Sequence, residues 1–110
     1  MIRILTMESQ RSIRIEADTL DYYDFSRQDL AWTLFDETDL TGTRFTQANL
    51  EMANFTRARL TGCDFTQAML KNADFTDSEL VDCHFEGADL TRAKFLRTRL
   101  INCTGLQQTD

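Results

Sequence analysis

The sequence LTGTRFTQA at residues 40–48 returns twenty residues later as LTGCDFTQA at residues 60–68. Both copies hold two bulky apolar residues five positions apart, and this spacing extends along most of the chain. From Leu20 to Leu100 every fifth residue is Leu or Phe, in strict alternation. Two positions earlier, from Thr33 to Cys103, the residue is always Ala, Thr, Ser or Cys. A fixed period of this kind indicates a solenoid.

A period of five fits neither an α-helix nor a straight strand. Five residues rotate a helical side chain well off its starting stripe, and an odd step along a strand places successive residues on opposite faces. The Leu and Phe side chains can share one inner face only if the chain turns a corner every five residues. Gly42, Gly62 and Gly87 fall at such corners, where a permissive backbone is useful. The sequence therefore predicts a flat-sided coil with small residues filling the space beside each Leu or Phe.

The spacing of oppositely charged residues along the sequence predicts how many sides each coil has. Residues one full turn apart stack at about 4.8 Å, where like charges repel each other. Between residues 18 and 104, ten pairs of residues twenty apart are both charged, and all ten are opposite in sign. The longest runs are Glu37–Arg57–Asp77–Arg97 and Asp39–Arg59–Glu79–Arg99. At a spacing of fifteen, which a three-sided coil would need, six pairs are opposite and six are alike. The pattern favours four sides.

The repeat unit reads small residue, Asp or Asn, Leu or Phe, and then two variable residues. Its clearest copies are Ala48-Asn49-Leu50, Ala53-Asn54-Phe55, Ala73-Asp74-Phe75 and Ala88-Asp89-Leu90. In this unit the sequence resembles the pentapeptide-repeat family over roughly residues 31–104. The resemblance implies a right-handed quadrilateral parallel β-helix, an all-β solenoid. It implies no single function, because members of the family do many different things.

We expect about four coils with an N-terminal strand cap. Asp18, Tyr23 and Gln28 occupy positions that are small elsewhere, which indicates a degenerate first coil. The expected organisation is capping strands at residues 1–17, the degenerate coil at 18–30, the regular β-helix at 31–104 and a short tail at 105–110.

The C-terminal end is expected to be unprotected, because the tail is too short for a stable capping helix. Its candidate interface residues are Phe95, Leu96, Leu100, Ile101 and Leu106. The resemblance implies that such an end pairs with its twin in a head-to-head homodimer. Burying a Phe or Leu contributes about 1.5–3 kcal/mol, which makes this pairing energetically reasonable. The alternative is that Leu106 folds back and covers its own coil.

A second apolar group is predicted on the outside of the coil. Trp32 and Met52 fall on one column, with Leu34 just around the corner. An exposed cluster of this kind can mark a site for a protein partner. The alternative is that the N-terminal strands, with Ile13 and Ile15, lie over it.

No catalytic, cofactor-binding or metal-binding constellation is present in the sequence. Cys63, Cys83 and Cys103 fall in one inner column, where they are expected to fill space rather than bind zinc, because neighbouring rungs do not supply four convergent ligands. His84 is expected to face solvent, with Asp64 one coil away as a weak partner. We therefore expect neither enzymatic activity nor a cofactor.

Composition narrows the class of protein. The 110 residues carry a net charge of −6, which disfavours binding to nucleic acid or to an anionic membrane. Three cysteines argue against a disulfide framework. The N-terminal residues lack the apolar run of a signal peptide, so a cytoplasmic location is expected. The absence of proline suits a ladder of hydrogen-bonded strands.

Two functions remain open on the sequence. The first is a rigid scaffold or adaptor that binds a protein partner, whose identity the sequence does not give. The second, implied by the resemblance to quinolone-resistance members of the family, is a DNA mimic that binds DNA gyrase or another type II topoisomerase. Alternating basic and acidic residues argue against the second, because a mimic needs a continuous negative surface.

Overall fold

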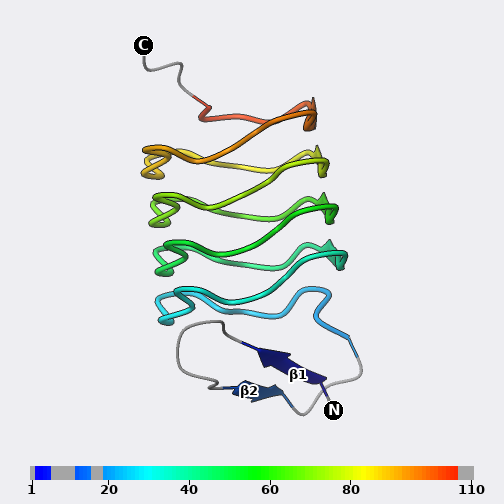
Figure 1. Cartoon of the computed structure of the whole chain (residues 1–110), viewed down its shortest axis with the longest axis vertical. Coiled ribbons are helices and arrows are strands. Elements are labelled where there is room, and N and C mark those ends of the chain that lie inside the picture. Colours follow the sequence, from blue (N-terminus) through cyan, green and yellow to red (C-terminus); the bar gives the residue numbers. More distant parts are fainter. Residues whose placement is uncertain (1, 6–11, 16–18, 107–110) are drawn as a thin grey trace.

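Residues 19–106 wind into a stack of flat-sided coils (Figure 1). The computed structural model describes residues 2–5, 12–15 and 19–106. Parallel bridges join residues twenty apart, as in Asp24 with Arg44 and Arg44 with Asp64. Further bridges with the same spacing start at Asp29 and Leu34. The prediction of four sides and twenty residues per coil is confirmed.

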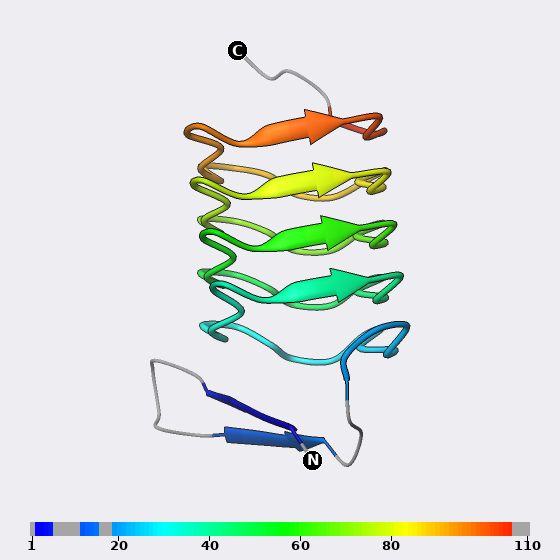
Figure 2. The same cartoon turned by 90° about the vertical axis from the view of Figure 1, so that its right-hand side faces the viewer.

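One side of the coil is regular enough to form a parallel sheet (Figure 2). Its strands are β3 (Asp39–Thr41), β4 (Arg59–Thr61), β5 (Glu79–Val81) and β6 (Arg99–Ile101). They pair in the order β3-β4-β5-β6, with the central Leu of each strand in register with the next. The other three sides are held by the bridges that start at residues 24, 29 and 34.

The core consists of stacked columns of one residue type each. Two columns of Phe run along the coil, one through Phe25, Phe45, Phe65 and Phe85 and the other through Phe35, Phe55, Phe75 and Phe95. Within a column the ring centroids lie 4.9–5.4 Å apart and the rings are nearly parallel. Between the columns the rings meet edge to face at 5.5–6.2 Å. Both are favourable arrangements of aromatic pairs, so alternating Leu and Phe builds a continuous interior.

From residue 44 onward, three corners of each coil are closed by a β-turn hydrogen bond. The small residue donates its N–H to the carbonyl three residues earlier, as in Ala48 to Phe45 at 3.0 Å and Ala58 to Phe55 at 3.2 Å. At the fourth corner, after the Leu of each β3–β6 strand, a side chain provides the bond instead. Cys63 Sγ donates to the carbonyl of Leu40, 3.5 Å away in the coil below.

Every corner also contains a residue with positive φ. Besides four glycines, fourteen other residues adopt φ values of 53–66°, among them Trp32, Met52 and Arg97. The N–H of the corner residue donates to a carbonyl of the next coil, as in Trp32 to Glu51 at 2.9 Å. This bond holds a conformation that L-residues otherwise rarely adopt.

The Asp or Asn that precedes many of the inward residues has a structural role. Its side-chain oxygen accepts the N–H two residues later, as in Asn54 with Thr56 at 2.8 Å and Asp89 with Thr91 at 3.0 Å. Such Asx turns lead the chain into the following corner. Hydrogen bonds from the hydroxyl and N–H of Thr91 lower the pKa of Asp89, because they stabilise the carboxylate.

The N-terminal segment forms a two-stranded antiparallel sheet. β1 (Ile2–Leu5) pairs with β2 (Ser12–Ile15), and both lie beyond the first coil (Figure 1). Residues 1, 6–11 and 16–18 lie outside the described residues, and a covering contact with the first coil stays a prediction. In that coil Tyr23 is half-buried and its ring centroid lies 4.6 Å from that of Phe25. The described part of the chain contains no helix of the length and apolar character that a bilayer span would need.

Candidate interaction surfaces

The C-terminal end of the coil is open. Leu100 is 44% exposed, whereas Leu80, directly below it in the same column, is fully buried. Phe95 is only half-buried, and β6 pairs with β5 alone. Leu96 and Ile101 project outward and are also exposed. These four residues therefore form an apolar end surface.

Leu106, the fifth residue predicted for this end, lies differently. It is half-buried and packs against the core. Gly105 before it comes so close to the coil below that an added Cβ would lie 2.4 Å from the backbone nitrogen of Glu86. Leu106 therefore covers part of the last coil, and Leu100 remains open beside it.

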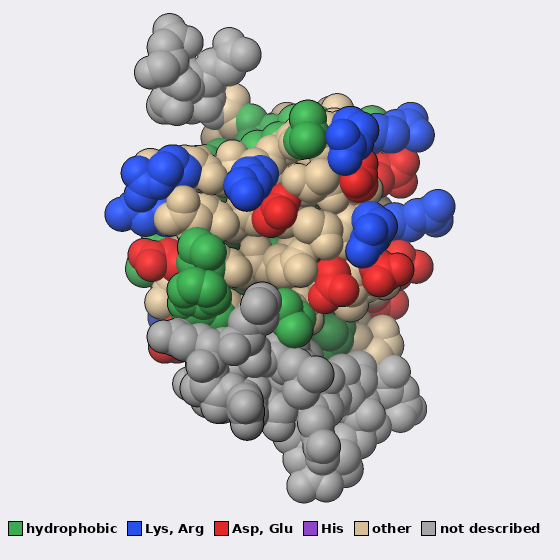
Figure 3. All heavy atoms as spheres, viewed as in Figure 1, with side chains coloured by type: hydrophobic (Ala, Val, Ile, Leu, Met, Phe, Trp, Pro, Cys, Tyr) green, Lys and Arg blue, Asp and Glu red, His purple; other side chains and the backbone are tan. Residues whose placement is uncertain are grey.

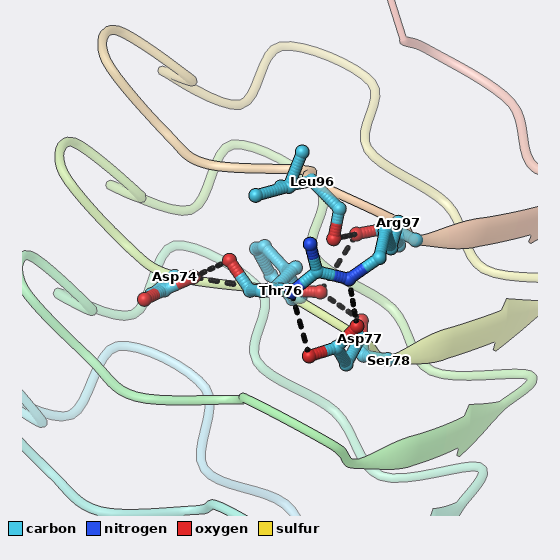
Figure 4. A network of polar contacts seen from close by, with 8 residues as sticks. Asp74, Thr76, Asp77, Ser78, Leu96 and Arg97 are labelled. Carbon is cyan, nitrogen blue, oxygen red and sulfur yellow. Dashed lines mark hydrogen bonds and ion pairs between the residues drawn. The ribbon is translucent and has the colours of Figure 1, made fainter.

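Charged side chains surround this end. Arg97 donates to both carboxylate oxygens of Asp77, at 2.6 and 3.2 Å (Figure 4). The hydrogen bond and the charge of Arg97 lower the pKa of Asp77. Arg99 forms a second ion pair with Glu79 at 3.4 Å. Both bases thus pair with the coil below and have no described coil above them.

The ion pairs follow the spacing that the sequence predicts. The three pairs found in the described residues, Arg57–Glu37, Arg97–Asp77 and Arg99–Glu79, all join residues twenty apart. Neutral side chains form hydrogen bonds at the same spacing, as in Gln47 to Gln67 at 3.2 Å. Basic and acidic side chains consequently alternate in layers along the coil (Figure 3).

The second predicted surface is less open. Trp32 and Met52 occupy equivalent corners of successive coils, and Leu34 lies on the next side, as the spacing predicts. Trp32 and Leu34 are half-buried, and only Met52 is exposed. The sequence reasoning did not include Met69, which is exposed one coil above Asn49. The signal that could have identified it is an apolar residue at a position that is polar or charged in all the other repeats except at Leu34.

The three cysteines of one inner column, Cys63, Cys83 and Cys103, supply the side-chain hydrogen bonds of the fourth corner. Cys83 and Cys103 donate to the carbonyls of Leu60 and Leu80, at 3.4 and 3.3 Å. Thr43 makes the equivalent bond to Leu20 at 2.8 Å. Thr43 and the three cysteines thus all donate from this column, and in another column Thr98 makes a bond of the same spacing, to the carbonyl of Phe75 at 2.7 Å. Burial raises the pKa of Cys103, which makes its thiol less reactive.

His84 does not pair with Asp64. Its Nδ1 lies 2.8 Å from the hydroxyl of Thr104, one coil above. Among the residues that the structure describes, no three His, Cys, Asp or Glu side chains cluster closely enough to hold a metal ion. The surfaces with unusual chemistry are thus the apolar end and the Trp32 group.

Known proteins agree with this geometry. Eight copies of the pentapeptide repeat match residues 24–62 and 68–104. A pentapeptide-repeat protein from the cyanobacterium Cyanothece 51142 superposes with a TM-score of 0.74 at 22% identity, over 82% of this chain and 61% of that one. A pentapeptide-repeat protein from the thylakoid lumen of Arabidopsis thaliana gives 0.60 at 32% identity, over 79% and 61%. The chain thus spans about three-fifths of the length of each of these neighbours. No curated protein matches the sequence. With its twenty-residue coils and its repeats matched over most of its length, the chain belongs to the pentapeptide-repeat family, and its fold is a right-handed quadrilateral β-helix.

Proposed function

We propose that this protein is a non-enzymatic scaffold that joins two copies through their C-terminal ends and presents its flat sides to a protein partner. The observation that carries the proposal is the exposure of Leu100, whose equivalents in the three coils below are buried. An open core edge is normally capped or paired in a solenoid. A second copy would supply what a further coil would otherwise supply.

The size of the end supports this pairing. The molecule is 39 Å long and 25 by 24 Å across. Two such ends in contact would bury about 1,200 Å² in total, which is the lower limit of specific protein interfaces. The proposed dimer is therefore of modest affinity and depends on its apolar centre.

The dimer is tested by measuring molecular mass with light scattering. We expect the wild-type protein to have the mass of a dimer, and Leu100→Arg to have that of a monomer, because a charge would be buried without a partner. Leu96→Arg is a second variant in which the changed side chain is already 60% exposed, so the fold is preserved. Met52→Arg, on an exposed corner away from the end, is the control and is expected to leave the mass unchanged. A monomeric wild type, or end variants that stay dimeric, would contradict the proposal.

A scaffold accounts for the surface better than a DNA mimic does. Mimicry of a duplex needs uninterrupted negative charge. Arg57 and Arg59 interrupt it in the second coil, and Arg97 and Arg99 interrupt it in the fourth. We therefore place binding to gyrase second.

A further inference from the structure

The charges of the last coil distinguish between the ways in which two ends can meet. Residues 87–106 make up one full coil at this end and contain a single acid, Asp89, with four bases. The bases are Arg92, Lys94, Arg97 and Arg99. Two such ends repel each other unless Asp89 of each copy lies against a base of the other.

The four sides of this coil can be named by one feature each. In chain order they are the Asp89 side, the Lys94 side, the β6 side and the Thr104 side. The corners between them are at Arg92, Arg97 and Asn102. A head-to-head dimer with two-fold symmetry brings matching surfaces together about an axis across the end. On a square end this axis runs either through the middle of two opposite sides or through two opposite corners.

Both axes through the middle of the sides bring like charges together. If the axis crosses the Asp89 and β6 sides, each of these sides meets its own copy, so Asp89 faces Asp89 and Arg99 faces Arg99. If it crosses the Lys94 and Thr104 sides, Asp89 meets Arg99 of the second copy twice, but Lys94 faces Lys94 and the Arg92 corner meets the Arg97 corner twice. Like charges then outnumber opposite ones. Like charges directly opposite each other at strand spacing are destabilising.

The two axes through corners differ in whether they bring like or opposite charges together. An axis through the Arg97 corner lays the Lys94 side on the partner's β6 side, so Lys94 meets Arg99. An axis through the Arg92 and Asn102 corners lays the Asp89 side on the partner's Lys94 side. Asp89 and Lys94 lie equally far from the turn at residues 91–92, so they come opposite each other twice, and only Arg92 faces its own copy at an exposed corner.

We infer that the proposed dimer has its two-fold axis through the Arg92 and Asn102 corners, an inference that rests on the dimer itself. Asp89 then lies over Lys94 of the second copy, just as Asp74 lies below Lys94 within one chain. The ion-pair ladder continues across the interface. By the same geometry Leu100 lies on Cys103 of the second copy, so the most exposed inward residue covers a half-buried one.

Cross-linking between single cysteines at the corners tests this arrangement. The parent is Cys103→Thr, because Thr43 makes the same hydrogen bond in that column. Cys63 and Cys83 are buried, and the parent is expected to give no cross-link. Into this parent we would place Arg92→Cys, Asn102→Cys or Arg97→Cys, and treat each with a short bis-maleimide. The axis brings residues 92 and 102 next to their own copies, so most of each of these variants should become covalent dimer, and Arg97→Cys should remain monomeric on a denaturing gel.

The outcomes separate the arrangement from the dimer. A wild-type protein that light scattering finds to be monomeric overturns the dimer and the arrangement with it. A parent that is monomeric while the wild type is dimeric supports the contact between Leu100 and Cys103. A dimeric parent overturns the arrangement alone if Arg97→Cys cross-links, or if Arg92→Cys and Asn102→Cys do not. The first of these results would place the axis through the other pair of corners.

Discussion

Positive φ at every corner is the feature of single residues that the sequence pattern does not reveal. Tyr, Arg, Trp, Glu, Gln, Met, Asn and Asp all occupy corners. An L-residue in this conformation costs about 1–2 kcal/mol. The fourteen non-glycine residues that adopt it here are of eight types, none of them β-branched, so no single residue type marks the corners. The inward positions are the opposite case. Burial separates Leu and Phe sharply from polar residues, and the five-residue pattern therefore predicted the core.

Two glycine substitutions separate backbone strain from steric overlap. A Cβ at Gly62 would meet nothing nearer than 4.0 Å, so Gly62→Ala should cost only the strain of positive φ, about 1 kcal/mol. A Cβ at Gly105 would lie 2.4 Å from the nitrogen of Glu86 and 2.6 Å from the carbonyl carbon of Phe85. Both are backbone atoms that cannot rotate away, so we expect Gly105→Ala to lose at least twice as much. Urea unfolding of both variants measures the difference, and equal losses would show that overlap at residue 105 is relieved without cost.

At the scale of the elements, the stacked charges explain why the number of sides could be predicted. Residues on one column of the coil are direct neighbours, so the sequence records their charges at a fixed spacing of twenty. The sequence could not show that only one side, β3–β6, forms a continuous sheet. At the corner after these strands, Thr43 and the cysteines supply hydrogen bonds from their side chains. Nothing in a list of small residues distinguishes this role from filling space.

The charge ladder predicts a salt-dependent loss of stability. Arg57 lies between Glu37 and Asp77, so Arg57→Glu places three acids in succession on one column. We expect the melting temperature to fall by a few degrees, and by more at low ionic strength, because exposed charges are screened by salt. The control is Arg27→Glu, at an equivalent corner whose neighbour one coil away is the uncharged Gln47. Calorimetry at two salt concentrations would contradict the ladder if both variants lost the same amount.

At the scale of the whole molecule, the two ends of the rod are not equivalent. The N-terminal end has β1 and β2 beyond its first coil (Figure 2). The C-terminal end exposes Leu100 beside a basic rim. An apolar interface at the C-terminal coil stays a prediction. In the structure Leu100 is exposed there, and Leu106 is half-buried and packs against the core. How two ends meet could not be read from a pattern along the chain, because it depends on which charges share an edge in space.

The alternation of charge along the rod predicts the outcome of a gyrase assay. We expect no inhibition of DNA gyrase supercoiling and no protection from a fluoroquinolone, because basic layers interrupt the acidic ones. The Arg57→Glu/Arg59→Glu variant makes the columns of both residues acidic over three successive coils, and it shows whether continuity of negative charge is what matters. Inhibition by the wild-type protein at low micromolar concentration would instead show that an interrupted surface suffices.

The period of the surface is twice the period of the backbone. Each coil repeats the main chain after twenty residues, but Glu37 and Asp77 are acidic while Arg57 and Arg97 are basic, so charge repeats only after forty. Deleting one coil would leave every core residue in register and bring like charges together. Deleting or duplicating two coils would preserve both the register of the core residues and the alternation of charge. A rod of this design can thus change its length without electrostatic conflict only in even numbers of coils.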